Sequence, residues 1–226
     1  MSENLKELTP SEIKRLLLLL SDELRYQGKK AIIYVVGGAN ISLTLDISRT
    51  TKDIDTVIKD GYDAVMAAAQ AVAAREPGLG HDWINSEFTG GNNPIGGLQW
   101  QWFDNRSVDI PTTYLATGSL IVETASPEMM LALKTIAGRE HDVQDAHKLM
   151  RMTGLRTYVE LLRNLETFTG PRLFQAQGQP TTSIHIRDNI RLILDNAPED
   201  LRPPRKVNRL EKFRSWRKAR RNARSS

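Results

Sequence analysis

The stretch YVVGGANISLTLDISRTTKDIDTVI, residues 34 to 58, decides how the first half of this chain folds. Its opening apolar run ends at Gly37-Gly38, a short helical stretch follows, and a second apolar run starts at Ile54. Glycine has no Cβ, so backbone N–H groups at this pair can approach an anion closely, and the helix that follows turns the positive end of its dipole toward it. The stretch therefore predicts two strands with a phosphate site between them.

Two aspartates mark the start of the second strand. Asp53 and Asp55 are separated by one residue, and strand side chains alternate between faces, so both carboxylates should point to the same face. That face would hold a divalent cation, bridged to the phosphates of a nucleoside triphosphate. The alternative is an exposed polar pair at a strand edge or a helix cap. The glycine pair upstream favours the metal site and predicts metal-dependent nucleotide chemistry.

Three more side chains of the stretch could contribute to that site. Thr51 lies two residues before Asp53 and shares its face if the strand has already begun there. Its hydroxyl would then bind a phosphate or orient the carboxylates; otherwise Thr51 is an ordinary strand threonine. Arg49 either clamps a phosphate or pairs with a nearby acid. Ser42 could donate to a phosphate, but its position fits a serine on the helix surface better.

A third carboxylate would complete a two-metal site by activating the attacking hydroxyl. Asp109 is the natural candidate, both as metal ligand and as catalytic group, because it lies in Ser107-Val108-Asp109-Ile110, a later predicted strand with apolar neighbours. Asp104 could instead belong to the turn before this strand.

Periodicity and capping residues predict an α/β chain that becomes all-helical after the middle. Thr9-Pro10-Ser11-Glu12 is a helix start whose apolar face continues to Leu24. Ser126-Pro127-Glu128 is another, and that helix should end at Gly138. The other expected strands are 31–36, 54–58, 99–103, 108–110 and 120–124, the other helices are 60–74, 143–152, 155–168 and 183–195, and 76–97 is largely loop.

The fold class expected from these elements is α/β, in the α+β sense, with a small mixed β-sheet flanked by helices and a helical C-terminal part. We expect a core over residues 1–125, a helical subdomain over 126–200 and a basic tail or helix over 201–226. The chain has no cysteine, which excludes disulfides and thiolate metal sites. The apolar run 16–20 is too short to span a bilayer and no signal peptide precedes it, so we expect a cytoplasmic protein without a membrane partner.

The end of the chain is strongly basic. Residues 202 to 226 contain eleven Lys or Arg and one acid, a net charge of +10, which leaves −6 on the other 201 residues because the whole chain carries +4. Apolar residues at 207, 210, 213 and 216 have helical spacing. This pattern favours a segment that grips RNA phosphates. The alternatives are a terminal helix docked on the acidic body and a solubilising tail.

The motifs together resemble a known family. The glycine pair, the short helix and Arg49-x-Thr51-x-Asp53-Ile54-Asp55 are similar to the active-site signature of the nucleotidyltransferase superfamily that includes DNA polymerase β. More narrowly, they resemble the branch that contains the bacterial AbiEii and MenT toxins. The resemblance runs roughly from residue 32 to 150. Its later part consists of Ser126-Pro127-Glu128, Leu131-Ala132-Leu133-Lys134, Gly138-Arg139, and Asp142 with Asp145.

The resemblance implies a nucleotidyltransferase fold and roles for three residues of the later part. Lys134 would reach the triphosphate as a point charge, although on its own it would be taken for a solvated helix lysine. Asp142 or Asp145 would complete the site, and Asp142 could instead be the N-cap of the next helix. The substrate would be an NTP with Mg²⁺ or Mn²⁺.

The resemblance also implies an activity, the transfer of a nucleoside monophosphate from an NTP to an acceptor hydroxyl. By similarity to the toxin branch, the acceptor would be the 3′ end of tRNA, held partly by the basic tail, and the partner would be an antitoxin encoded beside the protein. A protein or antibiotic hydroxyl is the alternative acceptor. From a different class comes an inactive module that binds RNA or a protein. A DNA-binding protein would need a helix-turn-helix, and no segment has its pattern.

Overall fold

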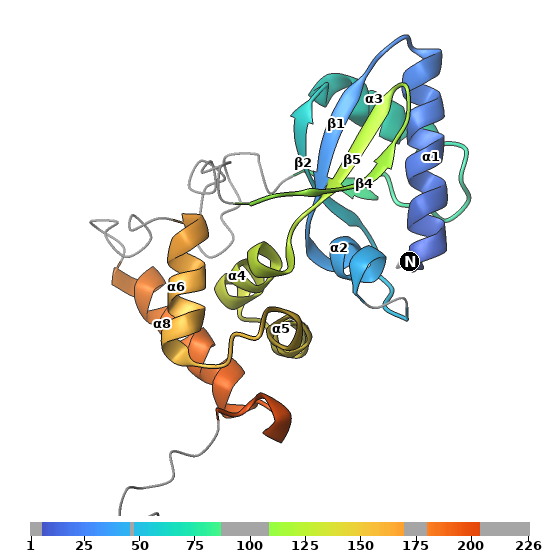
Figure 1. The fold of residues 1–226 in the computed structure, drawn as a ribbon. Coiled ribbons are helices and arrows are strands. Elements are labelled where there is room, and N and C mark those ends of the chain that lie inside the picture. Colours follow the sequence, from blue (N-terminus) through green and yellow to red (C-terminus); the bar gives the residue numbers. More distant parts are fainter. Residues whose placement is uncertain (1–5, 46–47, 87–108, 170–179, 204–226) are drawn as a thin grey trace, which may run out of the picture.

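The structure is a computed structural model and describes residues 6–45, 48–86, 109–169 and 180–203. Within these residues a five-stranded mixed sheet lies beside a group of helices (Figure 1). The strands are β1 Ala31–Val35, β2 Ile54–Asp60, β3 Ile84–Asn85, β4 Thr112–Ala116 and β5 Leu120–Thr124. The helices are α1 Pro10–Tyr26, α2 Gly37–Thr44, α3 Tyr62–Ala73, α4 Pro127–Ala137, α5 Glu140–Thr153, α6 Tyr158–Thr169 and α8 Pro180–Asp195, and the 3-10 helix η2 spans Glu199–Leu201.

β1 is the central strand of the sheet, whose order is β3-β2-β1-β5-β4. It runs antiparallel to β2 and parallel to β5, so that Val35 lies opposite Thr56 on one side and Thr124 on the other. β4 and β5 form an antiparallel pair, and β3 runs parallel to β2. The C-terminal ends of β1 and β5 and the N-terminal end of β2 therefore meet at one edge of the sheet, and α2 begins there.

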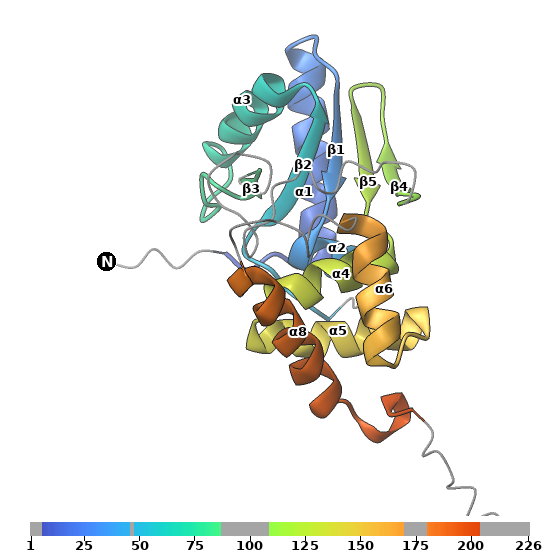
Figure 2. The same cartoon turned by 90° about the vertical axis from the view of Figure 1, so that its left-hand side faces the viewer.

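Helices α1 and α3 cover one face of the sheet (Figures 1 and 2). Their apolar stripes and the inward-facing strand residues form one hydrophobic core. The side chains of Leu16 and Leu20 from α1, Val65 from α3, and Ile33 and Val122 from the sheet are all buried in it. Burial of such side chains is the main stabilising contribution to this half of the molecule.

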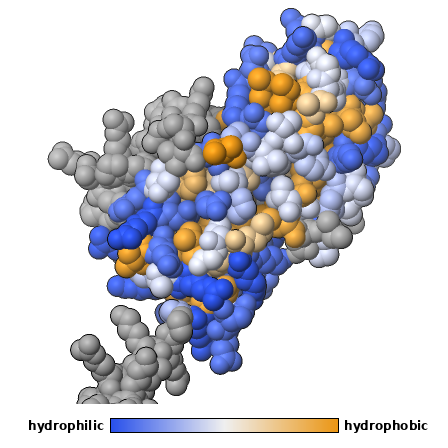
Figure 3. Space-filling model, in the orientation of Figure 1, coloured by the Kyte–Doolittle hydropathy of each residue, from blue (hydrophilic) through white to orange (hydrophobic). Residues whose placement is uncertain are grey.

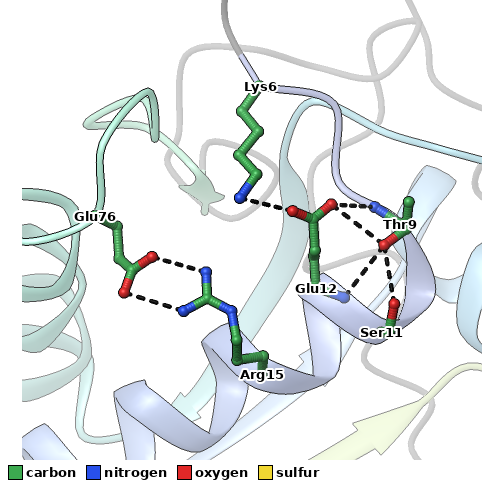
Figure 4. Close-up of polar contacts among 6 residues, drawn as sticks. All are labelled: Lys6, Thr9, Ser11, Glu12, Arg15 and Glu76. Atoms are coloured by element: carbon green, nitrogen blue, oxygen red, sulfur yellow. Dashed lines mark hydrogen bonds and ion pairs between the residues drawn. The ribbon is translucent and has the colours of Figure 1, made fainter.

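Polar contacts fix the N-terminal end of α1 (Figure 4). Thr9 Oγ1 accepts the N–H of Glu12 at 3.3 Å, and the Glu12 carboxylate accepts the N–H of Thr9 at 3.1 Å, which is a reciprocal capping box. The Arg15 guanidinium donates to both carboxylate oxygens of Glu76, just beyond α3. The predicted helix start is thus confirmed, and Arg15 links α1 to the end of α3.

The helices after β5 form a second hydrophobic core, built from α4, α5, α6 and α8, which pack together in Figure 2. It reaches the opposite face of the sheet through Tyr34 and Val57. Because strand side chains alternate, Tyr34 points away from the core that contains Ile33, and Asp55, two residues before Val57, lies on the same face as Val57. The second core and the predicted carboxylates thus share a face.

The predicted α/β class, with a mixed sheet flanked by helices and a helical C-terminal part, is confirmed. β5 has the predicted bounds, and α4 begins after Ser126 and ends at Gly138, whose φ of 59° suits glycine. The division of the chain into domains stays a prediction.

Other expected elements differ. Asp109 and Ile110 belong to no strand, and the two-residue β3 lies in the segment 76–97 that was expected to be largely loop. β4 was not predicted, because this edge strand is partly exposed along its length and lacks an alternating apolar pattern. The expected strand 99–103, Asp104 and most of the basic tail lie outside the described residues.

Apolar surface on the face seen in Figure 3 is divided into small patches among hydrophilic residues. Isolated apolar side chains of this kind are normal on a folded protein. Within the described residues, no helix combines the length and the apolar character needed to cross a membrane.

Candidate active site

The glycine pair lies where β1 ends and α2 begins, directly against the start of β2. Gly37 has a φ of 64°, and a Cβ built on it would lie 2.1 Å from Asp55 Oδ2. A Cβ on Gly38 would lie 3.0 Å from Thr51 Oγ1. Only glycine satisfies both the left-handed φ and the close contact at position 37. The first turn of α2 therefore touches the Asp55 carboxylate with no side chain between them.

The two carboxylates start β2 at this point. The strand begins at Ile54, and the carbonyl of Asp55 accepts the N–H of Val36 at 2.9 Å, which holds the start of β2 against the end of β1. Thr51 precedes the strand, and its hydroxyl donates to the carbonyl of Asp53 at 3.1 Å and lies 3.4 Å from Asp53 Oδ1. The geometry thus fits an orienting role for Thr51. Thr51 contacts Asp53 from the segment before β2, and not because the two residues share one face of a strand.

The electrostatics of Asp55 distinguish it from an ordinary surface acid. Burial raises its pKa to about 6, and the negative charge of Asp53 acts in the same direction. Lys134 and Arg139 oppose this rise in pKa, so both cations lie within electrostatic reach of the carboxylate. The negative charges of these two carboxylates would stabilise a cation bound beside them.

Ser42 is buried, so its interpretation as a helix-surface serine is wrong. Its hydroxyl donates to the backbone carbonyl of Arg49 at 2.7 Å. This bond fixes the segment that carries Arg49 against α2, and it leaves Ser42 a positioning role. A buried polar group normally finds such a partner.

Arg49 sits between the glycine pair and the helical part of the molecule. Its Nη2 lies 3.7 Å from where a Cβ on Gly38 would be, and its Nη1 forms an ion pair with Asp145. Arg49 thus pairs with an acid and also lies beside the first turn of α2. The two interpretations of this residue are therefore compatible.

Lys134 is not a solvated helix lysine, because only 7% of its surface is exposed. Its Nζ lies 2.5 Å from Asp142 Oδ1 and 2.9 Å from Asp145 Oδ2. With Arg49 these residues make a group of two cations and two anions, which we call the buried charge cluster. The cluster joins the segment before β2 to both α4 and α5.

Asp142 is not the N-cap of α5. That position belongs to Arg139, whose backbone N–H donates to Asp142 Oδ2 at 3.2 Å. Asp142 lies three residues on and also binds Lys134, and Asp145 binds Lys134 and Arg49. Both acids are thus engaged with cations, and the geometry fits positioning of Lys134 and Arg49 better than metal coordination.

Asp109 is held by Tyr34, whose hydroxyl donates to Asp109 Oδ2. Burial and then the bond to Asp109 raise the pKa of Tyr34 above its ordinary range, so the phenol stays protonated. Among the described residues no group of three or more His, Cys, Asp or Glu could hold a metal ion. The structure therefore does not gather Asp109 with Asp53 and Asp55.

Tyr34 is the residue that the sequence analysis missed at this site. It occurs inside an apolar run and was taken only as part of a buried strand. Its partner Asp109 is 75 residues away along the chain, so no local pattern signals the pair.

No protein-family model matches the chain, and no curated protein sequence matches it. A solved structure, an antigenic nucleotidyltransferase-like protein from Paracoccidioides brasiliensis, is similar at 18% identity and a TM-score of 0.40, with 80% of this chain and 95% of that chain covered. At this identity and TM-score, the similarity says nothing about the chemistry of the site.

Proposed function

We propose that this protein is a metal-dependent nucleotidyltransferase, which transfers a nucleoside monophosphate from an NTP to an acceptor hydroxyl. The observation that carries the proposal is the contact between Gly37 and Asp55, where a Cβ would come within 2.1 Å of the carboxylate. It sets a helix N-terminus, which favours phosphate, directly beside a carboxylate pair, which favours a cation. A triphosphate with its metal ion needs both.

The residues present fit Mg²⁺ or Mn²⁺. Asp53 and Asp55 offer hard oxygen ligands, and burial together with the negative charge of Asp53 raises the pKa of Asp55, so a cation beside it would favour its ionised form. Mg²⁺ commonly binds one or two carboxylates and completes its coordination with water and substrate phosphates. When bound, it would neutralise charge on the reacting phosphate and orient it. Asp53 and Asp55 would hold it.

The chain's own groups would then position the triphosphate. The backbone N–H groups at the start of α2 would bind phosphate oxygens, and Arg49 and Lys134 would add positive charge held in place by the buried charge cluster. The acceptor oxygen would attack the α-phosphorus, the bond to the β-phosphate oxygen would break, and pyrophosphate would leave. The hydroxyl proton would pass to water or to a carboxylate of the site.

The finer proposal concerns the acceptor. The resemblance to the AbiEii and MenT branch and the net charge of +10 over residues 202 to 226 support the 3′ end of tRNA as acceptor. In that case the protein would act as the toxin of a toxin–antitoxin pair and would bind an antitoxin. A protein or antibiotic hydroxyl is the competing acceptor.

Incubation of the full-length protein with each radiolabelled NTP, Mg²⁺ and total tRNA tests both the proposed transfer reaction and the proposed acceptor. The wild type should label RNA, and Asp53→Ala should reduce labelling by about a hundredfold or more. Asp60→Ala is the matched control, since Asp60 is an exposed aspartate at the other end of β2. Retained labelling by Asp53→Ala would overturn the site assignment. Label on protein in place of RNA would indicate that the acceptor is a protein hydroxyl.

A second candidate function is a nucleotidyltransferase-like module that binds without catalysis. The observation that favours it is that no third carboxylate joins Asp53 and Asp55 within the described residues. It predicts binding of an NTP with Mg²⁺ but no incorporation with any NTP. Equilibrium binding beside the labelling assay separates the two functions.

A further inference from the structure

A groove of about 740 Å³ opens where the start of β4, the first turn of α4 and the end of α6 meet. It contributes nothing to the phosphate and metal chemistry described above. Its volume is within the range of small-molecule sites.

The walls of the groove are mostly apolar. Ile110 and Met152 line it with 84% and 55% of their surface exposed, and Leu45 and the buried Phe168 lie beside them. Thr112, Thr113 and Thr124 are among its polar lining residues. Apolar walls with a few polar groups suit a flat, partly polar ring system.

Two acids line the groove, the exposed Glu128 and Asp109, and of the described groups in the groove Asp109 alone has a buried side-chain oxygen without a hydrogen-bond partner. Its Oδ2 accepts the Tyr34 hydroxyl, while its Oδ1 is buried and has no hydrogen-bond partner among the described residues. No described Lys or Arg forms an ion pair with it. A buried acceptor without a donor is costly, and its negative charge disfavours a phosphate. The groove therefore calls for a neutral ligand part with a hydroxyl or amino donor.

The hydrogen bond from Tyr34 to Asp109 connects the groove to the central strand of the sheet. Tyr34 lies opposite Val57 on β2, and Asp55 is two residues along the same face, which is about 7 Å along a strand. Through its bond to Tyr34, Asp109 thus contacts the face of the sheet that carries the proposed metal site. It lies on the side of the sheet where β5 and β4 pair.

We propose that this groove is a nucleoside subsite, in which the base and ribose lie against the apolar wall and Asp109 Oδ1 accepts a hydrogen bond from a hydroxyl or amino group. The placement of this nucleoside next to a transferred phosphate rests on the proposed function. Its source is either the incoming NTP or the terminal nucleotide of the acceptor, which share this chemistry.

The test is an NMR titration of the full-length, metal-free protein with adenosine, cytidine, guanosine and uridine. At least one should bind and shift signals of groove residues such as Ile110. Asp109→Asn should weaken that binding about tenfold or more, because the amide has one acceptor oxygen for two donors. In a Tyr34→Phe background the same Asp109→Asn substitution should cost less affinity, because the amide oxygen is then free for the ligand. Asp60→Asn is the control for a change of charge.

A second titration, with an NTP analogue that has a methylene group between its α- and β-phosphorus and with Mg²⁺, separates the sources. Displacement of the nucleoside assigns the subsite to the NTP, and simultaneous binding assigns it to the acceptor. Unchanged affinity in Asp109→Asn, or shifts only outside the groove, would overturn the proposal even if the wild type labels RNA. Nucleoside binding that depends on Asp109, without any labelling activity, would support the subsite and contradict the proposed function.

Discussion

At the scale of single residues, Gly37 has the most direct control over the geometry of the site. Gly37→Ala should destabilise the protein and displace the Asp55 carboxylate, because the new Cβ would lie 2.1 Å from Asp55 Oδ2. Gly28→Ala is a matched control, since Gly28 has a φ of 65° and open space around its Cβ position. Both variants should lose about 1–2 kcal/mol from the left-handed φ, and Gly37→Ala should lose about 1–3 kcal/mol more from overpacking.

Chemical denaturation measures these losses, and the labelling assay measures the effect on activity. Gly28→Ala should keep its activity, and Gly37→Ala should lose it. Equal losses of stability in the two variants would contradict the contact between Gly37 and Asp55.

Asp55 makes the stability of the metal-free protein depend on pH. Its pKa rises from 3.8 to about 6 on folding, so the folded state binds this proton more tightly than the unfolded state. Its stabilising contribution is present below about pH 4 and is lost as the pH rises to about 6. Relative to wild type, Asp55→Asn should therefore gain up to about 3 kcal/mol in free energy of unfolding between pH 4 and pH 7.

Denaturation curves in EDTA at several pH values measure this difference. A difference that does not vary with pH would contradict the raised pKa. Added Mg²⁺ should stabilise the wild type at pH 7 and leave Asp55→Asn unchanged.

At the scale of secondary-structure elements, the buried charge cluster joins α4 and α5 to the segment before β2. Asp145 is fully buried and binds both Arg49 and Lys134. Asp145→Ala would leave two cations without their shared partner, and it should cost about 3–5 kcal/mol in free energy of unfolding. Asp188→Ala is the control, because Asp188 pairs with Arg191 on the surface of α8.

The control should cost less than about 1 kcal/mol. A similar small cost for Asp145→Ala, measured by urea denaturation, would show that the cluster does not hold these elements together. Labelling activity should fall in Asp145→Ala, since Arg49 and Lys134 lose the carboxylate that holds both of them.

At the scale of the whole molecule, the basic tail separates the RNA-binding hypothesis from its alternatives. The last described element is η2, where Leu201 is buried and Arg202 donates to the carbonyl of Ala197. Truncation after Pro203 leaves these contacts intact. The truncated protein should bind tRNA at least about tenfold more weakly, and its affinity should depend less steeply on salt.

Filter binding or fluorescence anisotropy at several salt concentrations measures both effects. Trp216→Ala is the control, because it keeps every charge and should leave the salt dependence unchanged. An unchanged salt dependence after truncation would contradict RNA binding by the tail. A large loss of thermal stability would instead favour a terminal helix docked on the body.

The sequence by itself determined the local features of this protein. The order of strand, glycine pair, short helix and strand, the caps of α1 and α4, and the adjacency of Asp53 and Asp55 follow from residues close together in the chain. Such features depend on periodicity and capping, which neighbouring residues decide. The edge strand β4 was missed because partial exposure removes the alternating apolar pattern.

Only the tertiary structure decided which polar groups meet. Arg49 and Asp145 are 96 residues apart, and Tyr34 and Asp109 are 75 apart, so neither pair leaves a local pattern. Packing of α5 against α4 also buries Lys134, which the helix pattern alone would leave in solvent. A charge removed from water needs partners, and the fold alone determines which distant groups can supply them.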